Sequence, residues 1–378
     1  MKFWILIMSG NRSIWFNTKK KDMKTMIKYN LLVSLVAVFL ISCDEIIPEV
    51  QDSTSNDDEK ERWSIPVSEI KDGGPGKDGI PALTNPELLP VSSIAYLEDS
   101  DLVLGYKVGE EVRAYPHAIL DWHEIINDDI KDQSIAITYC PLTGTGIGWD
   151  RYVNGKKTTF GVSGLLYNSN LIPYDRNTDS NWSQILLESV NGELLGTEIK
   201  TRFLIETTWK TWKEFYPRSK VVSTNTGYDR NYGFYPYGNY KSNENLIFPA
   251  KPLDERLPAK ERVHAIIIDD DAKVYKVLDF KEENEIIHDE FNDTHILVIG
   301  NSNNNYVVSF YNPGKLAFKD VNSSDKPGII MEDELGNEYN LFGEVVNNAG
   351  DQLDLEPTVS FMAYWFSIGA FYPSTLIY

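Results

Sequence analysis

The sequence predicts a strand-dominated α+β fold made of two related lobes, each closed by a short helix. Short apolar runs rich in Val, Ile, Tyr and Thr alternate with Gly, Asn and Asp, which is typical of strands joined by turns. Long helical segments between the strands are missing, which argues against a doubly wound parallel sheet. Blocks of the first half recur in the second at an offset of about 160 residues, which indicates an internal duplication.

The first lobe is expected at about 88–222 and the second at about 263–378, with an aromatic connector at 223–262 lying across their interface. Strands are predicted at 102–107, 135–139, 146–151, 158–162 and 199–204, and in the second lobe at 263–268, 272–277, 295–299 and 306–311. The spacing of apolar residues predicts a short aromatic helix that closes each lobe. These residues are Trp209, Trp212, Phe215 and Tyr216 in the first lobe and Phe361, Trp365, Ile368 and Tyr372 in the second. A proline ends each helix.

The repeat rests on blocks that keep their order. RAY at 113–115 aligns with KVY at 273–275, and EIIND at 124–128 aligns with EIIHD at 285–289. Chance similarity between apolar strands is the alternative. The alignment places Cys140 on Asn301 and His123 on Asn284, so the thiol and the imidazole belong to the first lobe alone. This asymmetry points to a site in the first lobe.

The N-terminus has the features of a lipoprotein signal peptide, predicted at 1–42. Lysines precede a short apolar run at 31–41, which is too short to span a bilayer. LISC at 40–43 resembles a bacterial lipobox, in which Cys43 is lipidated; an ordinary signal peptide with an incidental cysteine is the alternative. Residues 1–22 are a possible start-site extension, and 43–62 reads as a disordered tether. The predicted location is the bacterial cell envelope, with the lipid anchoring the chain to a membrane.

The net charge of -20 and the absence of a basic face exclude nucleic acid as a partner. The chain has two cysteines. If Cys43 carries the lipid, Cys140 has no partner for an intrachain disulfide, and stability must come from core burial. A small-molecule or protein partner is left open by the sequence.

Several long motifs stand out: WHEIIND at 122–128, TYCPLTG at 138–144, FGVSGLLYNS at 160–169, YDR at 174–176 and KERV at 260–263. They resemble a bacterial and archaeal family called domain of unknown function 3179 (DUF3179), over about residues 63–378. The resemblance implies no established activity. Many members of that family have Cys-Pro-Leu-Cys at the turn, whereas Thr143 takes the second cysteine position here. A two-thiol redox couple or two-thiolate metal site is therefore not available.

Cys140 is the leading candidate residue because it ends an apolar strand and opens a turn in which Gly144 and Gly146 should let the backbone approach closely. With His123 it forms a candidate catalytic pair, since a nearby imidazolium would favour the thiolate. Cys140, His123 and His117 could instead bind a soft metal such as copper or zinc. Candidate binding residues surround the same turn: His117, Thr143, Gly144, Trp149, Arg151 and Arg176. An inert core cysteine is the third alternative. We expect Cys140 and His123 at the mouth of a pocket near the lobe interface.

The remaining motifs are weaker. Oxygen side chains at 175–181 are spaced like the start of a calcium loop, but Ser180 and Leu186 break the pattern and an Asx turn is favoured. The connector could stack on sugar rings or simply pack between the lobes. Two classes of function follow: an envelope protein with thiol or soft-metal chemistry at Cys140, or a non-catalytic binding or scaffold lipoprotein that uses an interlobe aromatic cleft.

Overall fold

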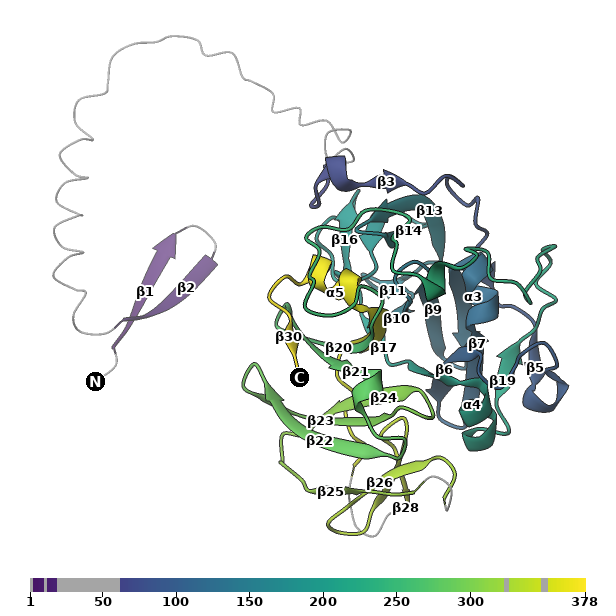
Figure 1. Ribbon diagram of the computed structural model, residues 1–378. Helices are drawn as coiled ribbons and strands as arrows, with labels where there is room; N and C mark the ends of the chain where they lie inside the picture. Colours follow the sequence, from purple (N-terminus) through teal and green to yellow (C-terminus); the bar gives the residue numbers. More distant parts are fainter. Residues whose placement is uncertain (1–2, 10–11, 19–61, 323–325, 348–352) are drawn as a thin grey trace, which may run out of the picture. The chain divides into compact units, whose positions relative to one another are not determined.

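A computed structural model describes residues 3–9, 12–18, 62–322, 326–347 and 353–378, which belong to two compact units (Figure 1). The first unit, 1–53, contains an antiparallel hairpin of β1 (Phe3–Ser9) and β2 (Arg12–Thr18). The apolar run at 31–41, Cys43 and the tether up to residue 61 lie outside the described residues. Among the helices that are described, none is long and apolar enough to cross a membrane.

The strand-dominated α+β class is confirmed in the second unit, residues 54–378. Its described part forms seven sheets and three α-helices of seven residues each. The helices are α3 (His117–His123), α4 (Trp209–Phe215) and α5 (Trp365–Phe371). Short 3-10 turns are η1 (Val67–Glu69), η2 (Val91–Ser93), η3 (Tyr240–Ser242) and η4 (Val277–Asp279).

Three five-stranded sheets and one small hairpin make up the first lobe and its N-terminal extension. The first sheet has the order β18 (Ile205–Thr208), β6 (Leu102–Val108), β7 (Glu111–Pro116), β19 (Lys220–Val222), β5 (Leu88–Pro90). The second has the order β17 (Thr201–Arg202), β10 (Thr145–Asp150), β9 (Gln133–Cys140), β8 (Ile125–Ile130), β4 (Leu83–Thr84). The third has the order β16 (Glu188–Asn191), β15 (Asn181–Ser183), β14 (Asn170–Asp175), β13 (Phe160–Tyr167), β3 (Lys71–Asp72). The hairpin pairs β11 (Tyr152–Val153) with β12 (Lys156–Lys157).

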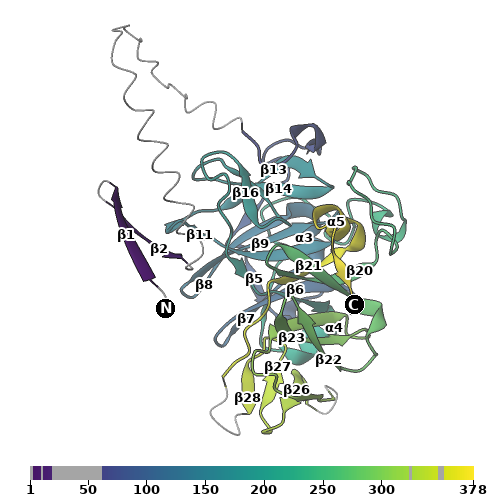
Figure 2. The ribbon, with the colours of Figure 1, turned by 90° about the vertical axis from the view of Figure 1, so that its left-hand side faces the viewer.

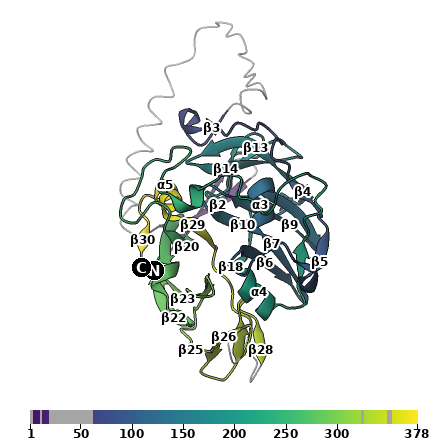
Figure 3. The ribbon, with the colours of Figure 1, turned by 45° about the vertical axis from the view of Figure 1, so that its right-hand side comes forward.

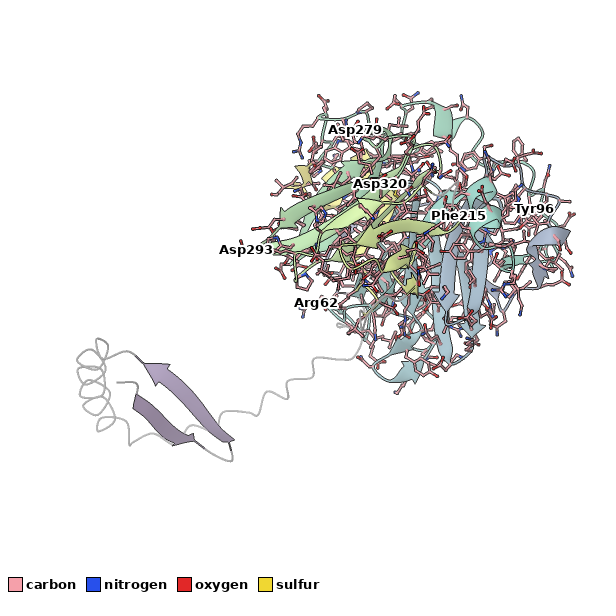
Figure 4. All side chains as sticks on the ribbon, turned by 90° about the horizontal axis from the view of Figure 1, so that it is seen from below. Arg62, Tyr96, Phe215, Asp279, Asp293 and Asp320 are labelled. Carbon is pink, nitrogen blue, oxygen red and sulfur yellow. The ribbon has the colours of Figure 1, made fainter. Side chains whose placement is uncertain are left out.

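The second lobe has three sheets. The first has the order β29 (Ser360–Tyr364), β20 (Arg262–Ile268), β21 (Asp271–Lys276), β30 (Leu376–Ile377). The second has the order β22 (Glu285–Phe291), β23 (Thr294–Asn301), β24 (Tyr306–Tyr311). The third has the order β25 (Phe318–Asp320), β26 (Ile329–Asp333), β27 (Glu338–Asn340), β28 (Val345–Asn347). Figure 4 labels Tyr96 and Phe215 on the first lobe and Asp279, Asp293 and Asp320 on the second.

Both predicted aromatic helices are present, but the second begins at Trp365, and Phe361, predicted as part of it, lies in β29. Thr208 caps α4 by accepting a hydrogen bond from the Thr211 N–H, while Trp209 and Trp212 are buried. Each helix ends two residues before its proline, at Phe215 and at Phe371. Helix α3 was not predicted, because its sequence HAILDWH lacks the aromatic residues at helical spacing that marked α4 and α5.

One sheet of each lobe follows the same path. The orders β18-β6-β7-β19 and β29-β20-β21-β30 correspond strand by strand, with the last strand parallel to its neighbour in both. Helix α4 precedes β19, as α5 precedes β30. An ion pair also recurs at aligned positions, buried in the first lobe and half-buried in the second: Arg113 Nη1 lies 2.7 Å from Asp128 Oδ2, and Lys273 Nζ lies 2.5 Å from Asp289 Oδ2.

The two lobes share a hydrophobic core. One buried cluster joins Cys140, Ile147 and Trp149 of the first lobe to Val263, Ala363 and Trp365 of the second. Strand β10 contacts β29 where the lobes meet, and the two are drawn side by side in Figure 3. Figure 2 shows α5 and β20 on the same side as the C-terminus. The loop between β9 and β10 therefore lies at the lobe boundary.

Candidate functional site

The 141–144 turn, residues Pro141 to Gly144, joins β9 to β10 and is held by all four of its carbonyl groups. The Tyr235 hydroxyl donates to Pro141 O at 3.4 Å, and the Tyr240 hydroxyl donates to Leu142 O at 2.8 Å. From the second lobe, the Tyr364 N–H donates to Thr143 O at 2.7 Å, and Arg262 Nη1 donates to Gly144 O at 2.5 Å. The turn therefore connects the first lobe, the connector and the second lobe.

Gly144 is required by this packing. Its φ of +60° is in the left-handed region, which glycine adopts without a steric penalty. A Cβ there would lie 2.5 Å from Arg262 Nη1 and 3.2 Å from the Tyr364 ring. The predicted close approach at Gly144 is thus real, but the approaching group is a side chain of the second lobe.

Arg262 belongs to a buried ionic cluster with Glu206 of β18 and His117 of α3. Arg262 Nη2 donates to Glu206 Oε1, and His117 Nε2 lies 3.3 Å from Glu206 Oε2. Burial alone would raise the pKa of Glu206, but Arg262 and His117 lower that pKa to about 2. Glu206 is therefore a carboxylate at neutral pH, and it pairs with the half-buried guanidinium of Arg262 at the lobe boundary.

Cys140 lies beneath the turn and is closed off from solvent. The residue is 1% exposed, and its thiol donates to Ser169 O at 3.5 Å. Burial, and to a lesser extent the Glu124 carboxylate, raise the pKa of the Cys140 thiol to about 11. This environment suppresses the thiolate, which is the opposite of what a nucleophile or a metal ligand needs.

His123 is occupied by other partners. Its Nδ1 is 2.7 Å from Pro81 O, and its Nε2 is 2.7 Å from the Tyr232 hydroxyl. Burial lowers the pKa of His123, so the ring is neutral. Cys140 and His123 lie on neighbouring elements, as expected, but both are enclosed and no hydrogen bond joins them. The prediction that this pair lies at the mouth of a pocket is wrong, because the connector and the second lobe cover the turn.

The proposed ligand set Cys140, His123 and His117 is likewise not assembled. His117 faces Glu206, whereas His123 faces Pro81 and Tyr232. Within the ranges that the structure describes, no group of three or more His, Cys, Asp or Glu side chains could hold a metal ion. The copper or zinc hypothesis thus has no donor set in this part of the chain.

Thr143 takes part in a buried network of amides and hydroxyls. Asn170 Nδ2 donates to Thr143 Oγ1 at 3.0 Å and to Gln184 Oε1 at 2.7 Å. Gln184 Nε2 continues the network to Thr138 Oγ1 at 2.9 Å. These side chains hydrogen-bond one another in the interior, with Asn170 Oδ1 left without a partner among the described residues, so the predicted binding residue Thr143 is part of a structural network.

The other predicted binding residues lie elsewhere and also hold the fold. Trp149 is fully buried, with its ring centre 5.1 Å from that of Phe160. Arg151 Nε donates to Thr158 O at 2.7 Å, and Arg176 Nη2 donates to Asp78 Oδ1 at 2.8 Å. The Asp175 carboxylate accepts the N–H groups of Asn177 and Thr178, forming the predicted Asx turn.

Two carboxyl groups of α3 and its end were missed by the sequence analysis. Asp121 pairs with Lys241 at 3.1 Å, and burial raises the pKa of Asp121. Burial also raises the pKa of Glu124 to about 7, although the Tyr237 hydroxyl donates to its Oε1 at 3.2 Å. Two acidic residues within the largely apolar segment 117–125 could have indicated buried carboxyl groups, but the sequence does not show which residues contact them.

Glu206 and Arg262 were also missed. Arg262 begins the apolar strand β20, but Glu206 lies in the short strand IETT, and the two residues are 56 apart in the sequence, so no local pattern joins them. Lys260 nearby donates to Tyr240 O and Asn243 O, both at 2.6 Å, and so fixes the connector.

The outer face of the connector carries exposed aromatic rings. Phe234 is 58% exposed and Tyr228 is 45% exposed. Trp122 Nε1 donates to Phe234 O at 3.1 Å, and the Arg230 guanidinium carbon lies 5.8 Å from a Trp122 ring centre. We name Trp122, Tyr228, Arg230 and Phe234 the connector face. The His123 ring centre lies 5.5 Å from that of Tyr228.

Glu124→Gln should stabilise the protein at high pH. With a folded pKa of about 7 against an ordinary 4.5, the folded state binds a proton that the unfolded state has lost, so stability falls as pH rises across this window. Glutamine keeps the acceptor for Tyr237 without the charge. Urea unfolding should show a gain of roughly 1–3 kcal/mol at pH 8 and much less at pH 5. Exposed Glu110→Gln is the control; an equal gain at both pH values would contradict the prediction.

The family described as "Protein of unknown function (DUF3179)" matches residues 77–375, which is most of the chain. No curated protein and no solved structure matches this chain. The resemblance to DUF3179 is thus confirmed over both lobes and the connector. The chain belongs to the DUF3179 family.

Proposed function

We propose that this chain is a lipid-anchored cell-envelope protein that acts by binding rather than by catalysis. The observation that carries the proposal is the 141–144 turn, whose four carbonyls are all bound by the connector and the second lobe. The turn that the sequence suggested as a reactive loop thus holds the connector and the second lobe against the first lobe. Thiol or soft-metal chemistry at Cys140 is disfavoured by the enclosure of the thiol and its raised pKa.

The connector face is the surface best suited to binding. The sequence suggested an interlobe aromatic cleft, but Tyr235 and Tyr240 use their hydroxyls on the turn and cannot line an open cleft. The rings of Tyr228 and Phe234 remain accessible instead. Aromatic faces bury the apolar face of a sugar ring while polar groups at their edges bind hydroxyls. A neutral glycan is the ligand class that this combination favours.

Glycan binding is tested with an array of neutral oligosaccharides. Because an aromatic contact contributes about 0.5–1.5 kcal/mol, removing two rings should weaken binding roughly tenfold or more. Tyr228→Ala/Phe234→Ala should therefore lose most of the signal. Leu278→Ala removes a side chain of similarly high exposure in the second lobe and should leave binding unchanged. Absence of any glycan signal, or equal loss in both variants, would sink the idea.

The lipid anchor is supported by the sequence before residue 44, where lysines, the apolar run and LISC follow in the order of a lipoprotein signal. Cys43→Ala should leave a larger precursor without lipid, detected by gel mobility and by incorporation of labelled fatty acid. Cys140→Ala is the matched control and should be processed normally. A wild-type chain released without any lipid would refute the anchor.

We also infer that the two lobes derive from an internal duplication. The corresponding strand orders and the recurring Tyr–Asp contacts support it: the Tyr115 hydroxyl donates to Asp128 Oδ2, and the Tyr275 hydroxyl donates to Asp289 Oδ2. Superposing these two contacts should bring the eight strands of the paired sheets into coincidence. A large rotation between the remaining strands would argue for chance similarity.

A further inference from the structure

Strand β30 forms one edge of its sheet in the second lobe (Figure 1). The corresponding strand of the first lobe, β19, is not an edge, because β5 pairs with it antiparallel on its far side. Arg113 lies beside Lys220 in the first sheet, as the aligned residue Lys273 lies beside Leu376 in the second, so Lys220 corresponds to Leu376. The first lobe therefore provides a template for a strand that would cover β30.

The outer backbone groups of β30 are open at Ile377. The Tyr378 N–H donates to Val274 O at 3.0 Å, so in this parallel ladder the N–H and C=O groups of Ile377 point to the other side, away from β21. The corresponding residue of the first lobe, Val221, is paired there with Leu89 of β5. Among the residues that the structure describes, no hydrogen bond to the Ile377 backbone is found on that side.

The side chains of this edge are apolar and exposed. Leu376 is 51% exposed and Tyr378 is 58% exposed, and the two lie on one face of the strand. Natural edge strands are usually protected from association by charged side chains, lysine above all. The first lobe has Lys220 at the position of Leu376 although β5 covers that strand. The second lobe thus has the apolar residue on the bare edge, which is typical of an interface.

The charges beside this edge are balanced. The whole chain has a net charge of -20, so most of its surface repels a second copy. Around β30, in contrast, the charged side chains occur as ion pairs: Lys273–Asp289 at 2.5 Å, Lys276–Asp279 at 2.6 Å, Arg256–Asp254 at 2.6 Å and Lys281–Glu285 at 3.1 Å. An uncharged apolar strand, or a second copy of this same edge, can therefore approach without like-charge repulsion.

We propose that β30 pairs antiparallel with β30 of a second copy of this chain, about a two-fold axis at Ile377. The axis lets the two Ile377 residues exchange both of their free backbone hydrogen bonds. It also places Leu376 of each copy opposite Tyr378 of the other, so the exposed apolar side chains cover one another. The edge is in this way complementary to itself, which favours a second copy over an unrelated strand. Because the paired strand is short, the dimer is reversible.

Sedimentation of the purified full chain in a density-matched detergent should show a monomer–dimer equilibrium that depends on concentration. Leu376→Lys, which introduces the residue of the first lobe, should weaken dimerisation roughly tenfold or more, because the charge is added twice to an apolar edge. Leu335→Lys, at a site in the second lobe that is 62% exposed, is the control and should leave the equilibrium unchanged. Circular dichroism checks that each variant is folded.

Disulfide formation tests the register. Paired residues of antiparallel strands have Cα atoms about 4.5–5.5 Å apart, which a disulfide can bridge. A mixture of Leu376→Cys chains with Tyr378→Cys chains should therefore form a linked dimer on mild oxidation. Leu376→Cys chains alone should link far less, since the axis separates their two cysteines along a diagonal of about 7–8 Å. The wild-type chain gives the background from Cys43 and Cys140.

A wild-type chain that stays monomeric at every concentration, which would leave the edge to solvent or to another extended partner, overturns the proposal. So does a dimer that Leu376→Lys leaves intact, or equal linking in the mixed sample and in the Leu376→Cys sample.

Discussion

The guanidinium of Arg262 is the constraint on which the lobe boundary depends. It is held between the carboxylate of Glu206 and the carbonyl oxygen of Gly144, so one side chain of the second lobe fixes two segments of the first. Glu206 is the buried member of this pair, and leaving a buried charge without its partner costs up to about 3–5 kcal/mol. The ionic cluster therefore requires the lobes to stay together.

The cover over Cys140 follows from this arrangement. With Arg262 and Tyr364 on one side of the turn, the connector tyrosines close the other side through Tyr235 and Tyr240. The thiol that ends β9 is left in a low-dielectric interior that favours its protonated form. The exposed rings able to meet a ligand then lie away from the turn, on the connector face.

Local patterns predicted the elements better than their contacts. The alternation at 102–107 and 263–268 identified β6 and β20, and the aromatic spacing identified α4 and α5. Glycine at 144 correctly indicated a close approach. The approaching group was beyond reach of the sequence, since Arg262 is 118 residues from Gly144 and no local pattern joins them. The predicted pairing of His123 with Cys140 failed because nearness in sequence does not fix where an imidazole points. The two ring nitrogens of His123 are hydrogen-bonded to Pro81 O and to the Tyr232 hydroxyl instead.

The most direct test of this account is the reactivity of the Cys140 thiol toward a thiol reagent, in a Cys43→Ser chain where it is the single cysteine. The native thiol should react at least a hundredfold more slowly than the denatured one. Arg262→Met should speed the native reaction at least tenfold by loosening the turn, whereas exposed Arg218→Met should not. A native thiol that reacts as fast as the unfolded one at neutral pH would contradict the enclosed, cohesive role assigned to the turn.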